Sequence, residues 1–475
     1  MGSAYQVLNI CAPMTHEQQS VSVEQIVNNM KHAKAEGADT VEIRLDCITS
    51  FHPLLHLKII LQNKPLPVLI ANRKKWDDSL SKGDDSMLLE ALQLALELGA
   101  DFIEVELKDA SCLPTLLEHK GNHNSHGKII VSCYVDDITP PQEELLQLVA
   151  RMQATGSDII KLVTHAADIT ELTRIFSLFP HCQNLQVPLI AYSCGERGLI
   201  SQLLCPKFGG FFVYGSLAGN PILGIPSLDS LKEAYKLEDV NEDTKVFGLI
   251  SKPVSHSKGP ILHNPSFRHV NYNGIYVPMF VDDLKEFFST YSSPDFSGFS
   301  VGIPYKEEVL RFCDEVHPLA QSIGAVNTII RRPGDGKLVG YNTDCEAAIT
   351  AIEDALIDRA KSLACAVSGE AQLYKELVNF EPEKGAILAN ATPIGMHPNT
   401  DRIPVAESTL EHYLLVFDAV YTPRRTRLLK EANAAGATTV GGVEMFLRQA
   451  IGQFNLFTGL EAPKEFMREI VLSKF

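Results

Sequence analysis

Short apolar runs recur through the first half of the sequence, with helical patterns or short loops between them. The runs lie at residues 7–11, 40–45, 67–71, 101–105, 128–133, 158–163, 187–192 and 210–215. Apolar residues at spacings of three and four, typical of amphipathic helices, occur at 21–35, 86–97, 142–154 and 168–179. This α/β pattern of eight strand-helix units predicts a closed parallel (β/α)8 barrel of the TIM type, with functional groups at the carboxyl ends of its strands.

Charged side chains occupy regular positions on these predicted strands. Glu42, Arg44 and Asp46 alternate along the second strand and so share one face of it, and Arg73 follows the third strand. Lys161 lies inside the sixth run, Ile-Ile-Lys-Leu-Val. Because an unpaired ammonium is very costly to bury, this lysine must be neutralised, paired or functional.

The second half of the sequence predicts two further α/β domains. Residues 1–235 form the barrel, and a polar linker at 236–245 leads to a middle domain at 246–346 and a last domain at 347–462. Predicted strands lie at 246–250, 274–279, 298–303, 325–330, 386–390, 415–419 and 438–440, and the clearest helical patterns at 282–290, 306–313 and 347–357. A final helix at 463–475 is expected to return to the middle domain.

Three apolar runs between residues 299 and 344 each end on an ionisable or amide side chain. They are Phe-Ser-Val-Gly-Ile-Pro-Tyr-Lys (299–306), Gly-Ala-Val-Asn-Thr (324–328) and Tyr-Asn-Thr-Asp (341–344). An α/β protein delivers polar groups to a cleft at strand ends in this way. Lys306 and Asp344 are therefore the first candidate catalytic pair, and a plain surface ion pair is the alternative.

Composition narrows the possible partners and compartments. With 42 basic and 58 acidic residues among 475, the net charge of -16 argues against nucleic acid or an anionic membrane as a partner. The ten cysteines form no C-x-x-C pair and no Cys/His cluster, so neither a disulfide framework nor a metal site is predicted. The first residues show no signal peptide, transit segment or membrane span, which favours the cytoplasm.

The first half resembles type I 3-dehydroquinate dehydratase. The resemblance rests on the barrel, on Val-Glu-Ile-Arg-Leu-Asp (41–46), on Lys161 and on Gly-Glu-Arg-Gly-Leu (195–199). It implies that Lys161 forms an imine with the ring ketone of the substrate. This imine acts as an electron sink for the loss of water. The residues implied to hold the hydroxyls and the carboxylate are Glu42, Arg44, Arg73 and Arg197. The alternative for each arginine is a charge at the rim.

The second half resembles shikimate dehydrogenase. The matching motifs include Lys-Pro-Val-Ser-His-Ser-Lys (252–258), Ile-Pro-Tyr-Lys (303–306), Asn-Thr-Asp (342–344) and Phe-Asp-Ala-Val-Tyr-Thr-Pro (417–423). The resemblance implies that Lys306 and Asp344 handle the proton while a nicotinamide accepts hydride. The implied substrate ligands are Ser255, Ser257, Asn327, Tyr421 and Gln449, and Gly442 with Met445 would contact the nicotinamide end of NADP.

Some of these residues have ordinary structural interpretations. A serine before a helical run is usually an N-cap, which applies to Ser255 and Ser257. Asn327 suits a turn or a strand end, and Gln449 suits a solvated helix face.

In this order, the two halves resemble the bifunctional plant dehydroquinate dehydratase/shikimate dehydrogenase family. That resemblance implies enzymes of the shikimate pathway, which leads to chorismate and the aromatic amino acids. It also implies NADP as cofactor, small-molecule substrates (3-dehydroquinate, 3-dehydroshikimate, shikimate or quinate) and the plastid as the alternative location.

Departures from the family pattern affect both halves. The family has a histidine general acid/base at the end of the fifth strand, where this chain reads Val-Ser-Cys-Tyr (131–134), and residues 221–225 lack the family's serine and glutamine. Because a phenol is a poor base at neutral pH, we expect impaired dehydration. An ordinary loop histidine is the preferred interpretation of His165, and a substitute base is the alternative. In the other half, Gly302 replaces the usual threonine and resembles quinate-using relatives, and sequence drift without a change of specificity is the alternative.

The cofactor-binding segment shows the largest departure. The family's G-x-G-G-x-G phosphate loop, with its flanking strands, is missing between the positions that match Ile357 and Asp358, and Val-Ser-Gly-Glu (367–370) lacks the glycine spacing. Since those glycines admit the pyrophosphate, NADP binding should be weak. The alternative function is a non-catalytic relative that binds shikimate-like or quinate-like carboxylates or oligomerises with an intact copy.

Overall fold

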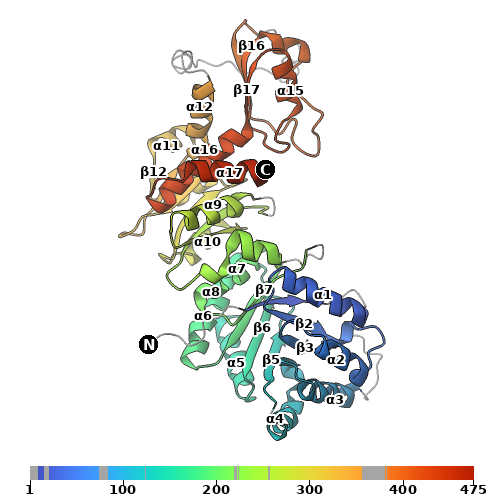
Figure 1. The fold of residues 1–475 in the computed structure, drawn as a ribbon. Coiled ribbons are helices and arrows are strands. Elements are labelled where there is room, and N and C mark those ends of the chain that lie inside the picture. Colours follow the sequence, from blue (N-terminus) through green and yellow to red (C-terminus); the bar gives the residue numbers. More distant parts are fainter. Residues whose placement is uncertain are drawn as a thin grey trace. The chain divides into compact units, whose positions relative to one another are not determined.

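The protein is described by a computed structural model (Figure 1). It describes residues 9–14, 21–73, 84–123, 125–218, 222, 224–254, 257–355, 380 and 382–474. The chain divides into two compact units, of which the first is Met1–Pro260 with Asn273–Phe296 and the second is Ile261–Tyr272 with Ser297–Phe475. The predicted linker and domain boundaries stay a prediction.

The first unit contains the barrel, and all eight predicted strands are confirmed. They are β1 (Asn9–Pro13), β2 (Thr40–Arg44), β3 (Val68–Ala71), β4 (Phe102–Glu106), β5 (Lys128–Tyr134), β6 (Ile159–His165), β7 (Leu189–Cys194) and β8 (Phe212–Tyr214). Neighbouring strands from β1 to β7 pair in parallel, and β8 pairs in parallel with β1. The backbone N–H of Phe211 donates to the carbonyl of Leu189 at 2.9 Å, which joins β8 to β7 and closes the ring.

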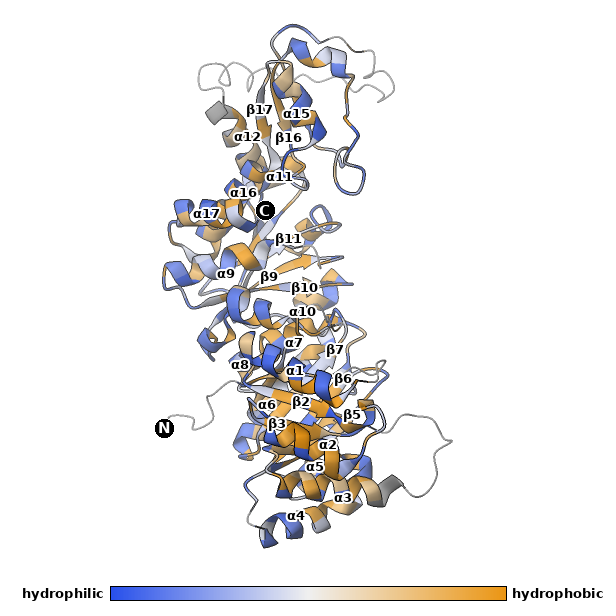
Figure 2. Ribbon diagram, turned by 45° about the vertical axis from the view of Figure 1, so that its right-hand side comes forward, coloured by the Kyte–Doolittle hydropathy of each residue, from blue (hydrophilic) through white to orange (hydrophobic). Residues whose placement is uncertain are grey.

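Helices follow the strands and bury one side of each amphipathic pattern. They are α1 (Val23–Ala35), α2 (Pro53–Gln62), α3 (Asp84–Glu97), α4 (Leu113–Asn122), α5 (Gln142–Gln153), α6 (Leu172–Asn184), α7 (Leu199–Leu203) and α8 (Cys205–Phe208). In α1, the Ser22 hydroxyl caps the first turn, and Val23, Ile26, Met30 and Ala33 are buried at helical spacing. Figure 2 shows largely hydrophobic barrel strands and helices that carry both hydrophobic and hydrophilic residues.

The rest of the first unit continues the α/β pattern. Strands β9 (Lys245–Ser251) and β10 (Gly274–Phe280) pair in parallel. Helix α10 (Leu284–Thr290) begins after Asp283, whose carboxylate accepts from the N–H of Glu286 at 2.9 Å. Asp282 lies in the loop between β10 and α10 and pairs with Arg197, a residue predicted for one of the candidate sites.

The second unit contains a mixed sheet and a parallel sheet. In the mixed sheet, β11 (Phe296–Val301), β13 (Thr328–Arg331) and β14 (Leu338–Tyr341) are antiparallel neighbours, and β12 (Glu315–Val316) pairs in parallel with β14. The parallel sheet consists of β15 (Ala386–Asn390), β16 (Tyr413–Asp418) and β17 (Thr438–Gly441). The predicted loss of strands after residue 357 lies outside the described residues.

The helices of this unit cover both sheets. They are α9 (Gly259–His269), α11 (Pro318–Ile323), α12 (Thr343–Ala355), α15 (Arg427–Ala434), α16 (Gly442–Thr458) and α17 (Lys464–Lys474). The helical pattern predicted at 306–313 forms a short 3-10 helix, Glu308–Phe312. Helix α17 lies against α9, where the rings of Phe466 and His269 stack at 4.2 Å. No helix among the described residues has the length and hydropathy needed to cross a membrane.

His263 on α9 is a titratable group in an apolar setting. Its ring centroid lies 5.8 Å from that of Phe457 and 6.1 Å from that of Phe267. Burial lowers the pKa of this imidazole from 6.5 to about 4, because the charged ring is costly to remove from water. Between these two pH values, the unfolded chain binds a proton that the folded chain does not.

We therefore expect the second unit to lose stability as the pH falls. The linkage from His263 alone should lower its free energy of unfolding by about 3 kcal/mol between pH 7 and pH 4. Urea unfolding across this range should show a flatter pH dependence for His263→Gln than for the wild type, whereas the variant of exposed His397, His397→Gln, should keep the wild-type slope. Equal slopes for His263→Gln and the wild type would contradict the linkage.

Candidate active sites

The lysine predicted inside the sixth strand is fully buried and paired with two carboxylates. Lys161 lies in the middle of β6 with 0% of its surface exposed. Its Nζ lies 3.0 Å from Oε2 of Glu42 on β2 and 2.8 Å from Oε2 of Glu104 on β4. The barrel thus brings three strands together around one ammonium group.

Two tyrosines donate hydrogen bonds to these carboxylates, and an arginine donates to one of the tyrosines. The Tyr214 hydroxyl donates to Glu42 Oε2 at 2.6 Å, and the Tyr134 hydroxyl donates to Glu104 Oε1 at 2.6 Å. Tyr134 also accepts from Arg73 Nη2 at 2.6 Å, and the guanidinium lies 3.9 Å from the centre of the tyrosine ring. We call Glu42, Arg73, Glu104, Tyr134, Lys161 and Tyr214 the lysine network.

The electrostatics of the lysine network favour its charged form. Burial lowers the pKa of the Lys161 ammonium, but the charges of Glu104 and Glu42 outweigh burial, so that the net pKa is raised. For Glu42, burial raises the carboxyl pKa, and the charges of Lys161 and Arg73 reverse that shift to give a lowered value. Burial also raises the pKa of the Tyr134 phenol well above its ordinary range. At neutral pH the lysine is therefore protonated and the phenol neutral.

The two other arginines predicted for this site each pair with an aspartate. Arg44 is buried and pairs with Asp46 at 2.6 Å, and the Asp46 carboxylate also accepts from the backbone N–H of Arg73 at 3.2 Å. Arg197 pairs instead with Asp282, at 2.5 and 3.0 Å. Tyr214 was not predicted, because one tyrosine in an apolar strand gives no signal apart from core packing. His165, the possible substitute base, is exposed at the end of β6.

The second candidate site contains the lysine and aspartate of the 299–344 stretch. Lys306 Nζ lies 2.6 Å from Asp344 Oδ2, with 39% of the lysine side chain and 24% of the aspartate side chain exposed. The backbone N–H of Val326 donates to the Lys306 carbonyl at 2.7 Å, and the N–H of Asn327 donates to the Tyr341 carbonyl at 3.0 Å. These bonds hold the three predicted motifs side by side.

Asn327 is buried next to this pair and holds the start of α12. Its Oδ1 accepts from the Thr343 N–H at 2.9 Å, and its Nδ2 donates to the Thr343 hydroxyl at 2.9 Å. The Thr328 hydroxyl donates to the same Oδ1 at 2.8 Å. Because Thr343 precedes Asp344 directly, the Asn327 amide positions the carboxylate that pairs with Lys306.

The remaining predicted residues of the second half have mixed surroundings. Ser257 caps the approach to α9, where its hydroxyl accepts from the Gly259 N–H at 3.2 Å, and Ser255 lies outside the described residues. Tyr421 is 37% exposed and packs on Phe446, with ring centroids 5.4 Å apart. Gln449 donates within its own helix to the Phe446 carbonyl at 2.9 Å.

Gly442, the predicted cofactor contact at the start of α16, lies where there is no room for a side chain. A Cβ on Gly442 would lie 2.3 Å from the Ala419 carbonyl oxygen, so a side chain at this position would push the helix away from the end of β16. Met445, one turn further on, packs against the core residues Leu415, Phe417 and Val440.

Comparisons with known families agree with the division into halves. Residues 10–242 match the family model of type I 3-dehydroquinase, and residues 249–329 match the shikimate dehydrogenase substrate binding domain. Residues 442–472 match the shikimate 5'-dehydrogenase C-terminal domain. The fold and these matches define the class: a dehydroquinase barrel followed by shikimate dehydrogenase domains.

Two individual relatives identify the family within this class more closely. The bifunctional 3-dehydroquinate dehydratase/shikimate dehydrogenase of Arabidopsis thaliana, named as chloroplastic, is 44% identical over 98% of this chain and 84% of its own length. The NADP-dependent shikimate dehydrogenase of Methanopyrus kandleri is 34% identical over 49% of this chain and 97% of its own length. The chain belongs to the family of bifunctional 3-dehydroquinate dehydratase/shikimate dehydrogenase enzymes.

A solved structure also spans both halves. The dehydroquinate dehydratase and shikimate dehydrogenase of S. pombe is 22% identical and covers 98% of each chain with a TM-score of 0.39.

Proposed function

We propose that the second half oxidises a ring hydroxyl of shikimate or quinate, with Lys306 and Asp344 as the proton-handling pair. The 2.6 Å contact between these two partly exposed side chains carries the proposal. Oxidation of a secondary alcohol needs a group beside the hydroxyl that takes its proton while hydride leaves. Lys306 lies close to Asp344 and is partly exposed to solvent, so it can accept the proton of a substrate hydroxyl.

The proposed substrate ligands are Ser255, Ser257, Asn327, Tyr421 and Gln449. Tyr421 is partly exposed, and burial raises the pKa of its phenol, which keeps the hydroxyl a donor. Asn327 acts through Thr343 by positioning Asp344. Gly302, without a side chain, leaves room for the additional ring hydroxyl of quinate.

We propose NADP as the cofactor, bound weakly. The sequence contains no G-x-G-x-x-G run, whose glycines would let the pyrophosphate approach a helix N-terminus. Gly442 and Met445 are the proposed contacts at the nicotinamide end, but Gly442 lies against the Ala419 carbonyl and Met445 packs on the protein core. The described residues therefore fit the cofactor poorly.

The direct test uses the full chain with NADP and either shikimate or quinate. We expect slow NADP reduction that saturates at high cofactor concentration, with quinate accepted. If calorimetry shows binding of either carboxylate and no NADP is reduced, the chain is instead a non-catalytic binding relative, or one that works with an intact copy. The missing glycine run favours that second function.

We propose that the barrel is an impaired 3-dehydroquinate dehydratase. Imine formation requires a neutral amine, and Lys161 is held as an ammonium by carboxylate oxygens 2.8 and 3.0 Å away. Tyr134 fills the position of the family's histidine, and its hydroxyl is engaged by Glu104 and Arg73. Neither group is ready to move a proton at neutral pH.

Replacement of Tyr134 by histidine should therefore raise dehydratase turnover. A general base at this position contributes on the order of a hundredfold, so Tyr134→His should gain about that factor in kcat for 3-dehydroquinate, followed by absorbance of the unsaturated product. Tyr134→Phe is the matched control, because it removes the hydroxyl and supplies no base, and its turnover should stay low. Efficient dehydration by the unaltered chain would disprove the impairment.

We propose the plastid as the location, with the cytoplasm as the alternative. The name of the Arabidopsis thaliana relative supports this choice. Imaging of a fluorescent fusion to the product of the complete gene tests it, and a diffuse cytoplasmic signal would reject it.

A further inference from the structure

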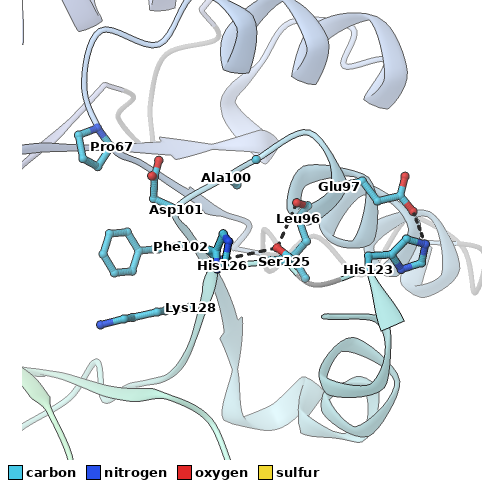
Figure 3. A pocket seen from close by; sticks show the side chains of 12 residues that line it. Pro67, Leu96, Glu97, Ala100, Asp101, Phe102, His123, Ser125, His126 and Lys128 are labelled. Atoms are coloured by element: carbon cyan, nitrogen blue, oxygen red, sulfur yellow. Dashed lines mark hydrogen bonds and ion pairs between the residues drawn. The ribbon is translucent and has the colours of Figure 1, made fainter. Parts of the chain in front are cut away.

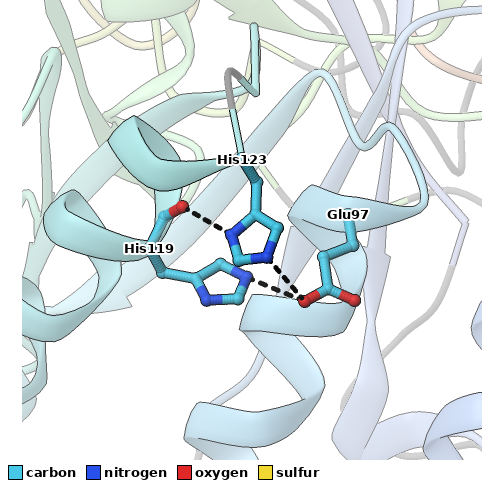
Figure 4. Close-up of side chains that lie close together, drawn as sticks. All are labelled: Glu97, His119 and His123. Carbon is cyan, nitrogen blue, oxygen red and sulfur yellow. Dashed lines mark hydrogen bonds and ion pairs between the residues drawn. The ribbon is translucent and has the colours of Figure 1, made fainter.

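Three potential metal ligands meet on the outside of the barrel. Glu97 is the last residue of α3, His119 lies on α4, and His123 follows α4 directly (Figure 4). One ligand atom from each side chain lies within 4.8 Å of the other two. Glu97 and His123 also line a cavity of about 870 Å³ that reaches the beginnings of β4 and β5 (Figure 3). This cluster lies near the amino ends of these strands and is separate from the lysine network.

The distances suit one ion between the three side chains. The Glu97 Oε1 atom lies 3.1 Å from His119 Nε2 and 3.9 Å from His123 Nε2. Two ligands that each lie about 2.1 Å from a tetrahedral zinc ion are separated by roughly 3.4 Å. The observed separations bracket this value, so small side-chain rotations would complete the geometry.

The hydrogen bond of His123 leaves the correct nitrogen available. Its Nδ1 lies 3.0 Å from the backbone carbonyl of His119. Since a carbonyl can only accept, Nδ1 carries the hydrogen and Nε2 has the free lone pair in the neutral ring. A backbone carbonyl that fixes the ring in this way is the usual support of a histidine that binds metal.

His119 supplies an independent observation. Its Nε2 atom is buried and pairs with Glu97 Oε1 at 3.1 Å, in a contact that is not directed well enough for a hydrogen bond. The rings of His119 and His123 are stacked with centroids 4.2 Å apart, so that both Nε2 atoms point toward the same carboxylate (Figure 4). A metal ion between this nitrogen and the carboxylate would supply the directed bond that the ion pair lacks.

We infer that Glu97, His119 and His123 form a zinc site that ties α3 to α4. Two imidazoles and one carboxylate are a donor set that zinc accepts, with a fourth position for water or a small anion. The site is independent of the catalytic proposals. Because the ion binds the folded chain, it should stabilise the barrel by an amount that grows with the logarithm of the zinc concentration divided by Kd.

The test is zinc titration of the full chain after removal of metal with a chelator. Calorimetry should show a site that is lost in the double variant His119→Ala/His123→Ala, and Co²⁺ in place of zinc should give the visible absorption of a low-coordinate site. His123→Ala alone should weaken binding at least tenfold, since even a partner of a ligand contributes about 10- to 100-fold. His181→Ala, which removes an exposed histidine on α6, is the matched control and should bind as the wild type does.

Two results would overturn the inference. One is equal zinc binding by the wild type and the double variant, which would place the ion elsewhere among the histidines and cysteines. The other is no binding by the wild type, which would leave Glu97 and the two histidines as a surface ion pair. His123 is 51% exposed, so its single variant should fold and keep the comparison valid if the double variant does not.

Discussion

Replacement of Lys161 by methionine is expected to destabilise the first unit by about 3–5 kcal/mol, the cost of breaking a buried ion pair by removing one partner. The side chains of Glu42 and Glu104 are 4% and 2% exposed, and the Lys161 ammonium lies 3.0 Å from the first and 2.8 Å from the second. Methionine preserves the volume of the lysine stem and removes the charge. Urea unfolding of the full chain, followed by a signal from the barrel, measures the loss.

The matched control removes one carboxylate together with the ammonium. Lys161→Met combined with Glu104→Gln leaves the charges of Glu42 and Arg73 to balance each other, and it should recover most of the lost stability. Acid should also relieve the single variant, because a buried carboxyl that has lost its compensating charge favours the neutral form. If Lys161→Met is as stable as the wild type at neutral pH, the three groups do not form the charged network described above.

Replacement of Lys306 by methionine should lower kcat for alcohol oxidation by about a hundredfold to ten-thousandfold, the usual contribution of a positioned acid-base group. The fold should tolerate this change, because the lysine side chain is 39% exposed and its pair with Asp344 contributes little stability. Initial rates of NADP reduction with shikimate and with quinate measure the effect. Asp344→Asn should also lower these rates.

A second lysine in the same unit provides the matched control. Lys337 pairs with Glu315 at 3.4 Å and is 49% exposed. Lys337→Met removes a similar surface ion pair away from Asp344, and its rates should equal those of the wild type. If Lys306→Met binds substrate and also keeps its turnover, the lysine has no part in proton transfer.

Much of the barrel could be predicted because its strands are regular. Each strand is an apolar run bounded by a helical pattern, and a parallel barrel repeats this unit, so the periods of two and of about 3.6 alternate clearly. The strands of the mixed sheet were harder to predict from the sequence. Strand β12 has two residues and β14 has four, with Gly340 inside, and such short segments show no alternation. Likewise, five residues of 3-10 helix have the same apolar spacing as an α-helical turn.

The sites were predictable where a charge stood out from an apolar strand. Lys161 within β6 and Lys306 after β11 could be identified in this way, and the structure pairs each with carboxylates. Partners that depend on packing were missed. Tyr214 reaches Glu42 only because β8 closes next to β1, and the zinc-site histidines approach Glu97 only because α3 and α4 are neighbours.

The ion pairs of the barrel also decide what kind of ligand it could accept without rearrangement. Lys161 and Arg73 contribute two positive charges to the lysine network and Glu42 and Glu104 two negative ones, so these four groups are electrically neutral together. Arg44 and Arg197 already hold Asp46 and Asp282. An incoming carboxylate would therefore have to draw an arginine away from its own aspartate, whereas an uncharged polyol would face no such competition.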